Sequence, residues 1–391
     1  MPAVCAVDVG TTRIKALTVS EEGTPGPVAG APSELETPRP GAAEVDADAL
    51  WRRTLGVLRQ AAATAGQVAA LAITNQRATV FVVDGAGTPL ARGLSWHDRR
   101  GEQALSAWLE RVGAAHFAQV TGLVPSALWS LSRILWWQQR GLPPGARFAT
   151  VQDWLLRRLG ASEWVLDPAN ASAVGLLNVH SLTWDDALLQ ATGVARAQLP
   201  ALAASGTPVG RLARGVAAAT GLPAGTPLIL GGGDQQCASL GAGVVDPGMV
   251  AANLGTAGVI SAPCERPLID RRGRLVCLAH VVPGRWVLEG LETSYGGGLT
   301  WGGDLLGEDP VAVAPEAEAS LFGTALLAWL GLGHWPDLHA AAAALPPPAR
   351  VVSPHPERRR LYHPVYERYQ AALAGLRQAR LLSFPAEARH G

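Results

Sequence analysis

The sequence has no net charge and no long apolar run. Its 391 residues contain 32 basic and 32 acidic side chains, so the formal net charge is zero. A chain without net charge gives no electrostatic reason to expect nucleic acid or an acidic membrane surface as a partner. No apolar run reaches the roughly 20 residues of a membrane span without glycine, proline or a charged residue interrupting it. We therefore expect neither a membrane protein nor a nucleic-acid-binding protein.

Cysteine is also scarce, and its spacing does not fit a metal site. The four cysteines are Cys5, Cys237, Cys264 and Cys277. Three of them lie in apolar runs, which is typical of buried thiols in a cytoplasmic protein. The first predicted strand begins within three residues of the N-terminus, so no signal peptide is expected. We predict a cytoplasmic location.

Lysine is almost absent, because Lys15 is the only one and every other basic side chain is arginine. One interpretation of this single lysine is chance. The other is functional, since a compact ammonium group beside a turn can serve as a point charge for phosphate. The sequence leaves both interpretations open.

Two segments share one pattern, in which an apolar strand, a tight Gly-Thr turn and a returning strand follow one another. The first occupies residues 4–19 and the second residues 250–260. The turn residues are Gly10, Thr11 and Thr12 in the first segment and Gly255 and Thr256 in the second. Backbone N–H groups and hydroxyls converge at such turns, where a phosphate can approach without meeting a Cβ. The repetition predicts two facing lobes that hold a nucleotide.

Two aspartates stand where phosphate chemistry would need them. Asp8 lies within an otherwise apolar strand, where burial is costly unless the carboxylate is paired, for example with a Mg²⁺ that bridges nucleotide phosphates. Asp234 follows three glycines at the end of a buried strand, where its carboxylate can meet a substrate hydroxyl closely. The alternative for Asp234 is an N-cap of the following helix. Beside two phosphate-type turns, the catalytic interpretation is preferred.

A further polar group follows two strand-like segments, at residues 75–77 and 95–100. Sugars and polyols are recognised by bidentate polar side chains together with an aromatic face. Gln76 and Arg77 supply the polar side chains and Trp96 the aromatic face. These residues are therefore candidates for a sugar pocket.

Hydrophobic periodicity predicts a chain of alternating strands and helices. Strands are predicted at 4–9, 14–19, 26–29, 69–74, 79–84, 228–230, 249–254, 258–262, 275–281 and 286–289, and helices at 47–65, 99–119, 126–140, 150–159, 235–241, 319–330 and 362–382. Asp46 or Asp48 is the expected N-cap of the first helix.

Taken in order, these segments resemble the FGGY carbohydrate kinases of the actin-like sugar kinase and chaperone superfamily. The matching segments are Asp8–Lys15, Ile73–Arg77, Trp96–Arg100, Asp167–Ser172, Gly231–Gln236 and Leu254–Thr256. The resemblance implies an α/β protein with two actin-like (ribonuclease H-like) domains and a cleft between them. It places an N-terminal domain at residues 1–247 and a C-terminal nucleotide domain at 248–391.

The resemblance also implies a reaction and its site. ATP and Mg²⁺ are the implied cofactors, and a small sugar or polyol is the implied partner that receives the γ-phosphate. Asp234 is the implied general base, with Asp8 as the metal ligand. Gly10, Thr11, Thr12, Lys15, Gly255, Thr256 and Asp8 are expected at the nucleotide phosphates, and Gln76, Arg77, Trp96, Asp234 and Gln235 in the sugar pocket.

The chain departs from this family in two ways. Glycerol-type kinases have Glu and Tyr where this chain has Ala78 and Leu128, which disfavours glycerol as substrate, and the pentulose-type pattern is not matched cleanly either. The second domain is shortened near residues 307–318, where roughly a hundred residues that include an adenosine-binding turn are absent. Weakened ATP binding is therefore expected.

Two other functions are consistent with parts of the pattern. The first is a catalytically impaired sugar-binding or regulatory paralogue that lacks the adenosine site. The second is an actin-like assembly or chaperone ATPase, in which Gln76, Arg77 and Trp96 would have no role. The sequence leaves the oligomeric state open, and a homodimer is the commonest state among soluble oligomers.

Overall fold

A computed structural model describes residues 2–254, 258–292, 311–314 and 318–353, together with scattered positions between 357 and 371. The chain forms two compact units. The first comprises residues 1–253, 260–290 and 316–345, and the second comprises 254–259, 291–315 and 346–391. Gly255, Thr256 and most of the predicted helix 362–382 lie outside the described residues. The predicted domain boundary at residue 247 stays a prediction.

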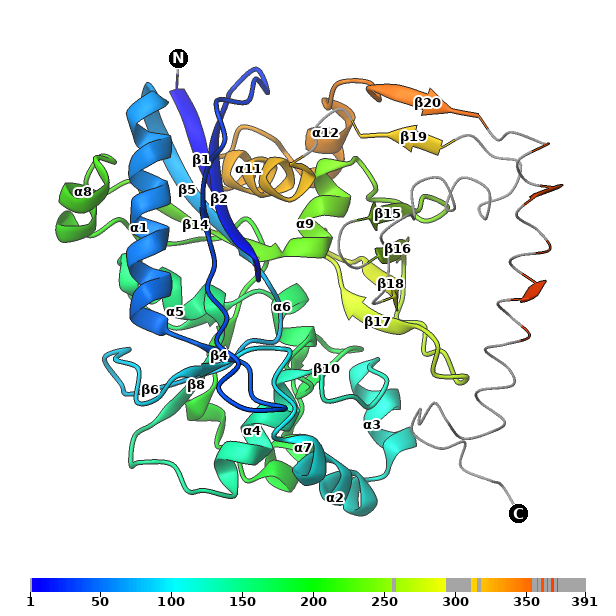
Figure 1. Cartoon of the computed structure of the whole chain (residues 1–391). Helices are drawn as coiled ribbons and strands as arrows, with labels where there is room; N and C mark the ends of the chain where they lie inside the picture. Colours follow the sequence, from blue (N-terminus) through cyan, green and yellow to red (C-terminus); the bar gives the residue numbers. More distant parts are fainter. Residues whose placement is uncertain are drawn as a thin grey trace. The chain divides into compact units, whose positions relative to one another are not determined.

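A six-stranded mixed sheet forms the centre of the first unit (Figure 1). Its order is β13 (Pro208–Arg211), β14 (Pro227–Gly233), β5 (Gln67–Asn75), β1 (Pro2–Val9), β2 (Arg13–Ser20) and β3 (Ala29–Pro32). β1, β5 and β14 are parallel, whereas β2 runs antiparallel to β1. The predicted hairpin is confirmed. The third strand pairs at residues 29–32 rather than 26–29, because Pro25 and Pro27 have no N–H to give to a ladder.

Helices cover both faces of this sheet, because successive side chains of a strand point to opposite sides. Cys5 and Val7 of β1 belong to the core that includes residues of α1 (Ala47–Thr64), and Val4 and Ala6 to the core that includes residues of α11 (Ala319–Gly331). Figure 1 shows α1 and α11 on opposite sides of the strands. Central parallel strands that are buried on both faces explain the near-continuous apolar strands in the sequence.

Two helix boundaries bear on the predictions. α1 begins after Asp46, whose Oδ1 accepts a hydrogen bond from the Ala49 N–H at 2.9 Å, so one of the two proposed caps is confirmed. The single helix predicted at 99–119 is instead two helices, α2 (Glu102–Val112) and α3 (Ala114–Thr121). Gly113 separates them at a φ of 88°, a conformation that favours glycine.

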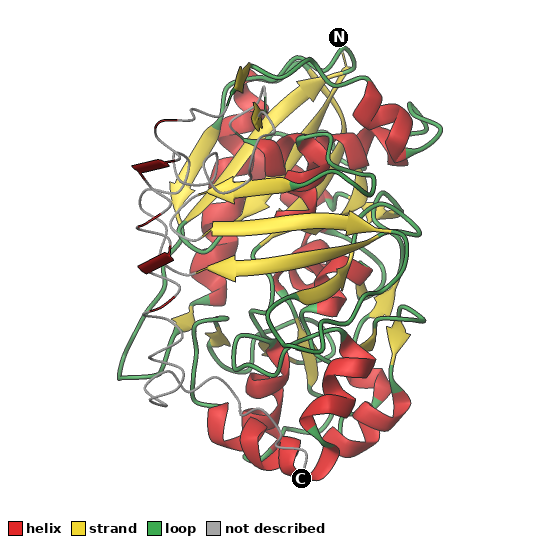
Figure 2. Cartoon of the chain, turned by 90° about the vertical axis from the view of Figure 1, so that its right-hand side faces the viewer, coloured by secondary structure: helices red, strands yellow, loops and turns green. Residues whose placement is uncertain are grey.

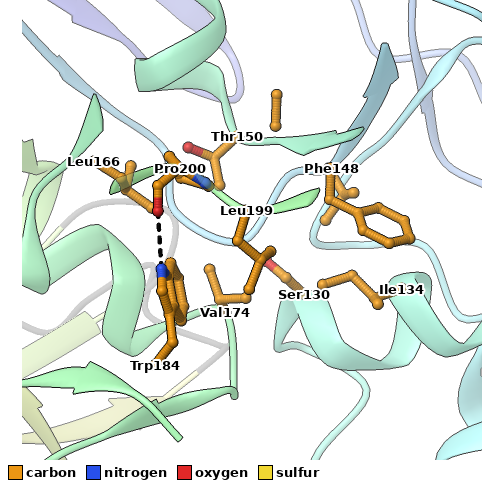
Figure 3. Close-up of a pocket in the computed structure, with 11 residues that line it drawn as sticks. Ser130, Ile134, Phe148, Thr150, Leu166, Val174, Trp184, Leu199 and Pro200 are labelled. Atoms are coloured by element: carbon orange, nitrogen blue, oxygen red, sulfur yellow. Dashed lines mark hydrogen bonds between the residues drawn. The ribbon is translucent and has the colours of Figure 1, made fainter. Parts of the chain in front are cut away.

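A second hydrophobic core lies among α2, α3, α4 (Ser130–Gln138) and α7 (Asp186–Thr192), with Trp108 and Phe117 fully buried. It contains a cavity of about 10 Å³ (Figure 3). Its lining residues are Val80, Ser130, Ile134, Phe148, Ala149, Thr150, Leu166, Val174, Trp184, Leu199 and Pro200. A space of this size holds about one water, so the cavity is too small for a sugar.

A four-stranded sheet has the order β15 (Ala251–Leu254), β16 (Gly258–Cys264), β18 (Trp286–Glu292) and β17 (Val276–Ala279). Its strands are seen as neighbouring arrows in Figure 2. In the second unit, β19 (Val311–Val313) pairs with β20 (Arg350–Val352). The remaining elements are β4 (Glu44–Val45), β6 (Phe81–Val83), β7 (Gly93–Leu94), β8 (Arg147–Ala149), α5 (Val151–Leu159), β9 (Val165–Leu166), α6 (Pro168–Ser172), β10 (Leu177–Asn178), β11 (Thr183–Trp184), η1 (Arg196–Gln198), β12 (Ala201–Leu202), α8 (Arg214–Thr220), α9 (Asp234–Gly241) and α12 (Leu338–Ala343).

A buried carboxyl group at the start of α5 gives a pH-dependent stability. Asp153 Oδ1 accepts hydrogen bonds from the backbone N–H and the hydroxyl of Thr150, and burial raises the pKa of Asp153 to about 7 although these bonds lower it. The folded state therefore holds a proton that the unfolded chain releases near its ordinary pKa of 3.8. The stability that this proton contributes is present below pH 4 and is lost as the pH rises to about 7.

We expect Asp153→Asn to remove this pH dependence, because the amide does not titrate. The difference in thermal midpoint between the variant and the parent protein should grow in favour of the variant by about 5–10 °C between pH 4 and pH 8. Calorimetry at both pH values measures it, and the other buried carboxyl groups cancel in the comparison. A difference that stays constant with pH would contradict the prediction.

Candidate active site

The carboxyl ends of three neighbouring parallel strands place the predicted catalytic and sugar-binding side chains at one edge of the central sheet. β14, β5 and β1 are adjacent and parallel. Asp8 lies near the end of β1, Gln76 and Arg77 follow β5, and Asp234 follows β14. Residues from distant parts of the sequence therefore meet where open α/β sheets bind ligands.

Asp234 is the first residue of α9, not its N-cap. The N-cap position belongs to Gly233, and among the described residues Asp234 Oδ1 accepts a hydrogen bond only from the adjacent Gln235 N–H, at 2.8 Å. The alternative interpretation of Asp234 as a helix cap is thus wrong. Burial raises the pKa of Asp234 to about 7, against the lowering effect of Arg77, while Asp8 and Glu289 raise it further.

Glycines before Asp234 let the strand approach its neighbours. A Cβ on Gly231 would lie 2.0 Å from the carbonyl oxygen of Ile73, and one on Gly232 would lie 2.2 Å from Val281 Cγ1. Real Cβ contacts of this length do not occur, so these two positions need glycine. The glycine run therefore has a packing reason that accounts for its place before Asp234.

Arg77 connects Asp234 to Glu289 of β18. Its Nη1 and Nη2 lie 3.1 Å and 2.9 Å from the two carboxylate oxygens of Glu289, whereas its Nε lies 3.5 Å from Asp234 Oδ1. Burial alone would lower the pKa of the guanidinium, but Glu289 and Asp234 raise the pKa of Arg77 above its usual value. Arg77 therefore stays charged in a buried position.

Asp8 has one satisfied and one unsatisfied carboxylate oxygen. Its Oδ2 accepts a hydrogen bond of 2.6 Å from Ser320 Oγ at the start of α11. Its Oδ1 is buried and finds no hydrogen-bond partner among the residues that the structure describes. Burial raises the pKa of Asp8, and the hydrogen bond from Ser320 opposes this rise. Such an oxygen is suited to an additional ligand that carries positive charge.

Lys15 forms an ion pair with Glu318. Its Nζ lies 2.7 Å from both carboxylate oxygens of Glu318, the residue directly before α11. The lysine is thus beside the first turn, as the functional interpretation required, but its charge is neutralised by a carboxylate 303 positions along the chain.

The first Gly-Thr turn is tied to the aromatic candidate. Trp96 Nε1 donates a hydrogen bond of 2.8 Å to Thr11 Oγ1, and this hydroxyl donates one of 3.0 Å to Gln76 Oε1. The neighbouring Thr12 is exposed. Gln235 lies apart from this turn in its hydrogen bonding, because its side-chain oxygen accepts a hydrogen bond from Asn253 at 3.0 Å. The structure therefore joins Thr11 of the predicted phosphate turn to two of the predicted sugar residues, Gln76 and Trp96, in one hydrogen-bonded chain.

A fully buried arginine fixes the loop that carries Trp96. Arg133 donates to the carbonyl oxygens of Asp98 at 3.1 Å, Ala127 at 2.8 Å and Leu128 at 2.6 Å. Burial lowers the pKa of Arg133 to about 9, although Asp98 raises it. Arg133 thus ties the Trp96 loop to the segment before α4.

Three side chains of this site, Glu289, Glu318 and Ser320, are not among the residues predicted from the sequence. A signal existed for Glu289, because a glutamate within the apolar strand 286–289 stands out in the same way as Asp8. Nothing near Glu318 or Ser320 in the sequence indicates that they contact residues of the first hairpin.

Among the described residues, no helix has both the length and the apolar character to cross a membrane.

Comparisons with known proteins identify the family of the chain. Residues 3–241 match the N-terminal domain of the FGGY family of carbohydrate kinases. The chain is 31% identical over 353 residues to an apulose kinase from Pectobacterium atrosepticum, covering 85% of this chain and 71% of that protein. It is 33% identical over 362 residues to a glycerol kinase from Trichlorobacter lovleyi, covering 86% and 71%.

Solved structures share the fold. A ligand-bound xylulose kinase from Lactobacillus acidophilus aligns with a TM-score of 0.86 at 16% identity, covering 96% of this chain and 98% of that one. A glycerol kinase from Plasmodium falciparum with ADP aligns with a TM-score of 0.84 at 16% identity, covering 95% and 98%.

The sheet edge with its converging carboxylates and the family match define a phosphotransferase of the sugar kinase class. The chain belongs to the FGGY family of carbohydrate kinases. The predicted family and the predicted α/β, actin-like fold class are confirmed.

Proposed function

We propose that this protein transfers the γ-phosphate of ATP to a hydroxyl of a sugar or polyol, with Asp234 as the general base. The observation that carries the proposal is the place of Asp234, next to Arg77 at the end of β14, with a pKa of about 7. A general base works best when its pKa lies near the working pH. The names of the related apulose and glycerol kinases support a sugar or polyol as the acceptor.

In the proposed reaction, the oxygen of the substrate hydroxyl attacks the γ-phosphorus, and the Asp234 carboxylate accepts the proton of that hydroxyl. The bond from phosphorus to the bridging oxygen breaks, and ADP leaves. Gln76, Trp96 and Gln235 are the side chains proposed to hold the sugar. Arg77, which is held by Glu289, presents a fixed positive charge beside the reacting hydroxyl.

The residues at the phosphate end fit the proposed cofactors. Mg²⁺ is bound in such sites by one or two carboxylates together with phosphate oxygens and water, and it neutralises phosphate charge. The unsatisfied Oδ1 of Asp8 is the group proposed to hold the ion. Gly10, Thr11 and Thr12 are proposed to face the phosphates, and Lys15 to contribute once the nucleotide competes with Glu318. The roles of Gly255 and Thr256 stay predictions.

A coupled assay of ADP release over pentuloses, hexoses and polyols tests the proposal. We expect release that depends on one class of acceptor and is stronger than release with glycerol, since Ala78 and Leu128 stand where glycerol-type kinases have Glu and Tyr. Calorimetric titration of the same compounds shows binding independently of turnover. Sugar binding without ADP release for any acceptor would favour the impaired paralogue.

A further inference from the structure

Glu289 is a buried carboxylate that the proposed reaction does not itself require. It lies on β18 with only 4% of its surface exposed. Removing a carboxylate from water costs on the order of several kcal/mol if it has no partner. A buried carboxylate is therefore expected to be paired. Its partners are Arg77, through two contacts, and the side-chain amide of Gln236, whose Nε2 donates to Oε1 at 3.2 Å.

The two contacts with Glu289 fix the plane of the Arg77 guanidinium. A bidentate arginine–carboxylate pair sets orientation as well as charge, because both groups are planar. Asp234 receives only the Nε of Arg77, at 3.5 Å, a longer and single contact. The two carboxylates therefore share one cation unequally, and the buried one holds it more closely.

The geometry points to Glu289 as a positioning residue that keeps Arg77 from closing a two-point ion pair on Asp234. The Asp234 carboxylate is thereby left free to accept the proton of a substrate hydroxyl. This inference rests on the proposed role of Asp234 as the base. It assigns to β18 a part in catalysis that is exerted through Arg77, without contact with the substrate.

The charges around Asp234 fix the direction of the effect. Arg77 lowers the pKa of Asp234, whereas Asp8 and Glu289 raise it. Asp167, directly before α6, raises the pKa of Arg77. Lys15 lowers the pKa of Asp8 and Glu318 raises it, so these two charges oppose each other. Removing the charge of Glu289 takes away one group that raises the pKa of Asp234 and releases the cation that lowers it. Both changes make Asp234 a weaker base.

Glu289→Gln tests the inference, because it keeps the shape of the side chain and removes its charge. The titration of Asp234 is followed by ¹³C NMR of the aspartate carboxyl carbons in the full chain, with the resonance assigned by its loss in Asp234→Asn. We expect the pKa of Asp234 to fall by about 1 unit or more, as for a carboxylate that gains a close guanidinium. An unchanged titration would overturn the inference.

Two further variants keep the test decisive. Glu289→Asp retains the charge but cannot reach Arg77 as well, so a smaller fall is expected, and this variant carries the test if Glu289→Gln does not fold. No fall in either variant overturns the inference. Asp153→Asn removes another buried carboxyl group from the same unit, and it should leave the titration of Asp234 unchanged.

Kinetics separate this inference from the proposed function. In Glu289→Gln, we expect kcat to fall and the acidic limb of its pH profile to move to lower pH, with the KM for ATP unchanged. A merely structural role would lower the thermal midpoint without moving the limb. An active Asp234→Asn variant would contradict the proposed base, whereas an inactive one combined with an unchanged titration in Glu289→Gln would contradict only the inference.

Discussion

Replacing Asp234 with asparagine is expected to lower acceptor-dependent ADP release by about 10²- to 10⁴-fold, the usual contribution of a general base. The amide has the size of the carboxylate but cannot accept the proton of the substrate hydroxyl. The coupled assay measures the loss with whichever acceptor the parent protein uses. Since the asparagine also removes a buried negative charge next to Arg77, the thermal midpoint should be recorded to show that the variant is folded.

The pH profile gives a second reading of the same residue. A carboxyl group with a pKa of about 7 keeps its proton at pH 6 and has lost most of it at pH 8. The kcat/KM of the parent protein should therefore rise as the pH increases through about 7. Asp153→Asn is the matched control, because it removes a buried aspartate outside the site and should retain activity. If acceptor-dependent ADP release by Asp234→Asn stayed within about tenfold of that by the parent protein, Asp234 would be ruled out as the base.

Adding one methyl group at Gly323 is expected to lower the free energy of unfolding by about 3 kcal/mol, the upper end of the range for overpacked cores. Gly323 of α11 faces α9, and its Cβ would lie 1.9 Å from the Cys237 carbonyl oxygen. Gly241 of α9 makes the reciprocal approach, with its Cβ 2.0 Å from the Ala319 carbonyl oxygen. Backbone atoms cannot turn aside as a flexible side chain does, so the helices would have to separate.

Gly56→Ala is the control for Gly323→Ala. Gly56 also lies within a helix, α1, but a Cβ there would meet no atom within 4 Å. Alanine should stabilise that helix by about 0.5–1 kcal/mol, since it loses less backbone entropy on folding than glycine does. Urea unfolding followed by circular dichroism measures both variants. If the two substitutions changed the free energy of unfolding equally, the close contact between α9 and α11 would not be the reason why position 323 needs glycine.

The contact between α9 and α11 also bears on the active site. α9 begins with Asp234, and the first turn of α11 carries Ser320, which donates to Asp8. A separation of these helices would therefore move the proposed base and the hydroxyl that holds the proposed metal ligand. We accordingly expect Gly323→Ala to lose activity at temperatures where it is still folded.

Local patterns in the sequence predicted the polar residues at strand ends because burying a charge in an apolar strand is costly without a function or a partner. Asp8 was recognised in this way, whereas Asp234 was recognised from its place after three glycines at the end of a strand. Glu289 carries the same signal in β18, but its meaning depended on Arg77, which lies 212 positions away. The split between α2 and α3 at Gly113 was missed, because glycine within a helical pattern does not by itself show where its φ becomes positive.

The sequence by itself determined the family, the strands β1, β2, β5 and β14 of the central sheet, the helices α1, α9 and α11, and the candidates Asp8, Gln76, Arg77, Trp96 and Asp234. Each of these follows from periodicity, from local composition or from motifs that keep their order along the chain. The partners of these side chains were decided only by the tertiary structure. Lys15 pairs with Glu318, Asp8 with Ser320, and Arg77 with Glu289. These contacts exist because parallel strands and the α9–α11 pair bring distant residues together, and no local pattern encodes such distances.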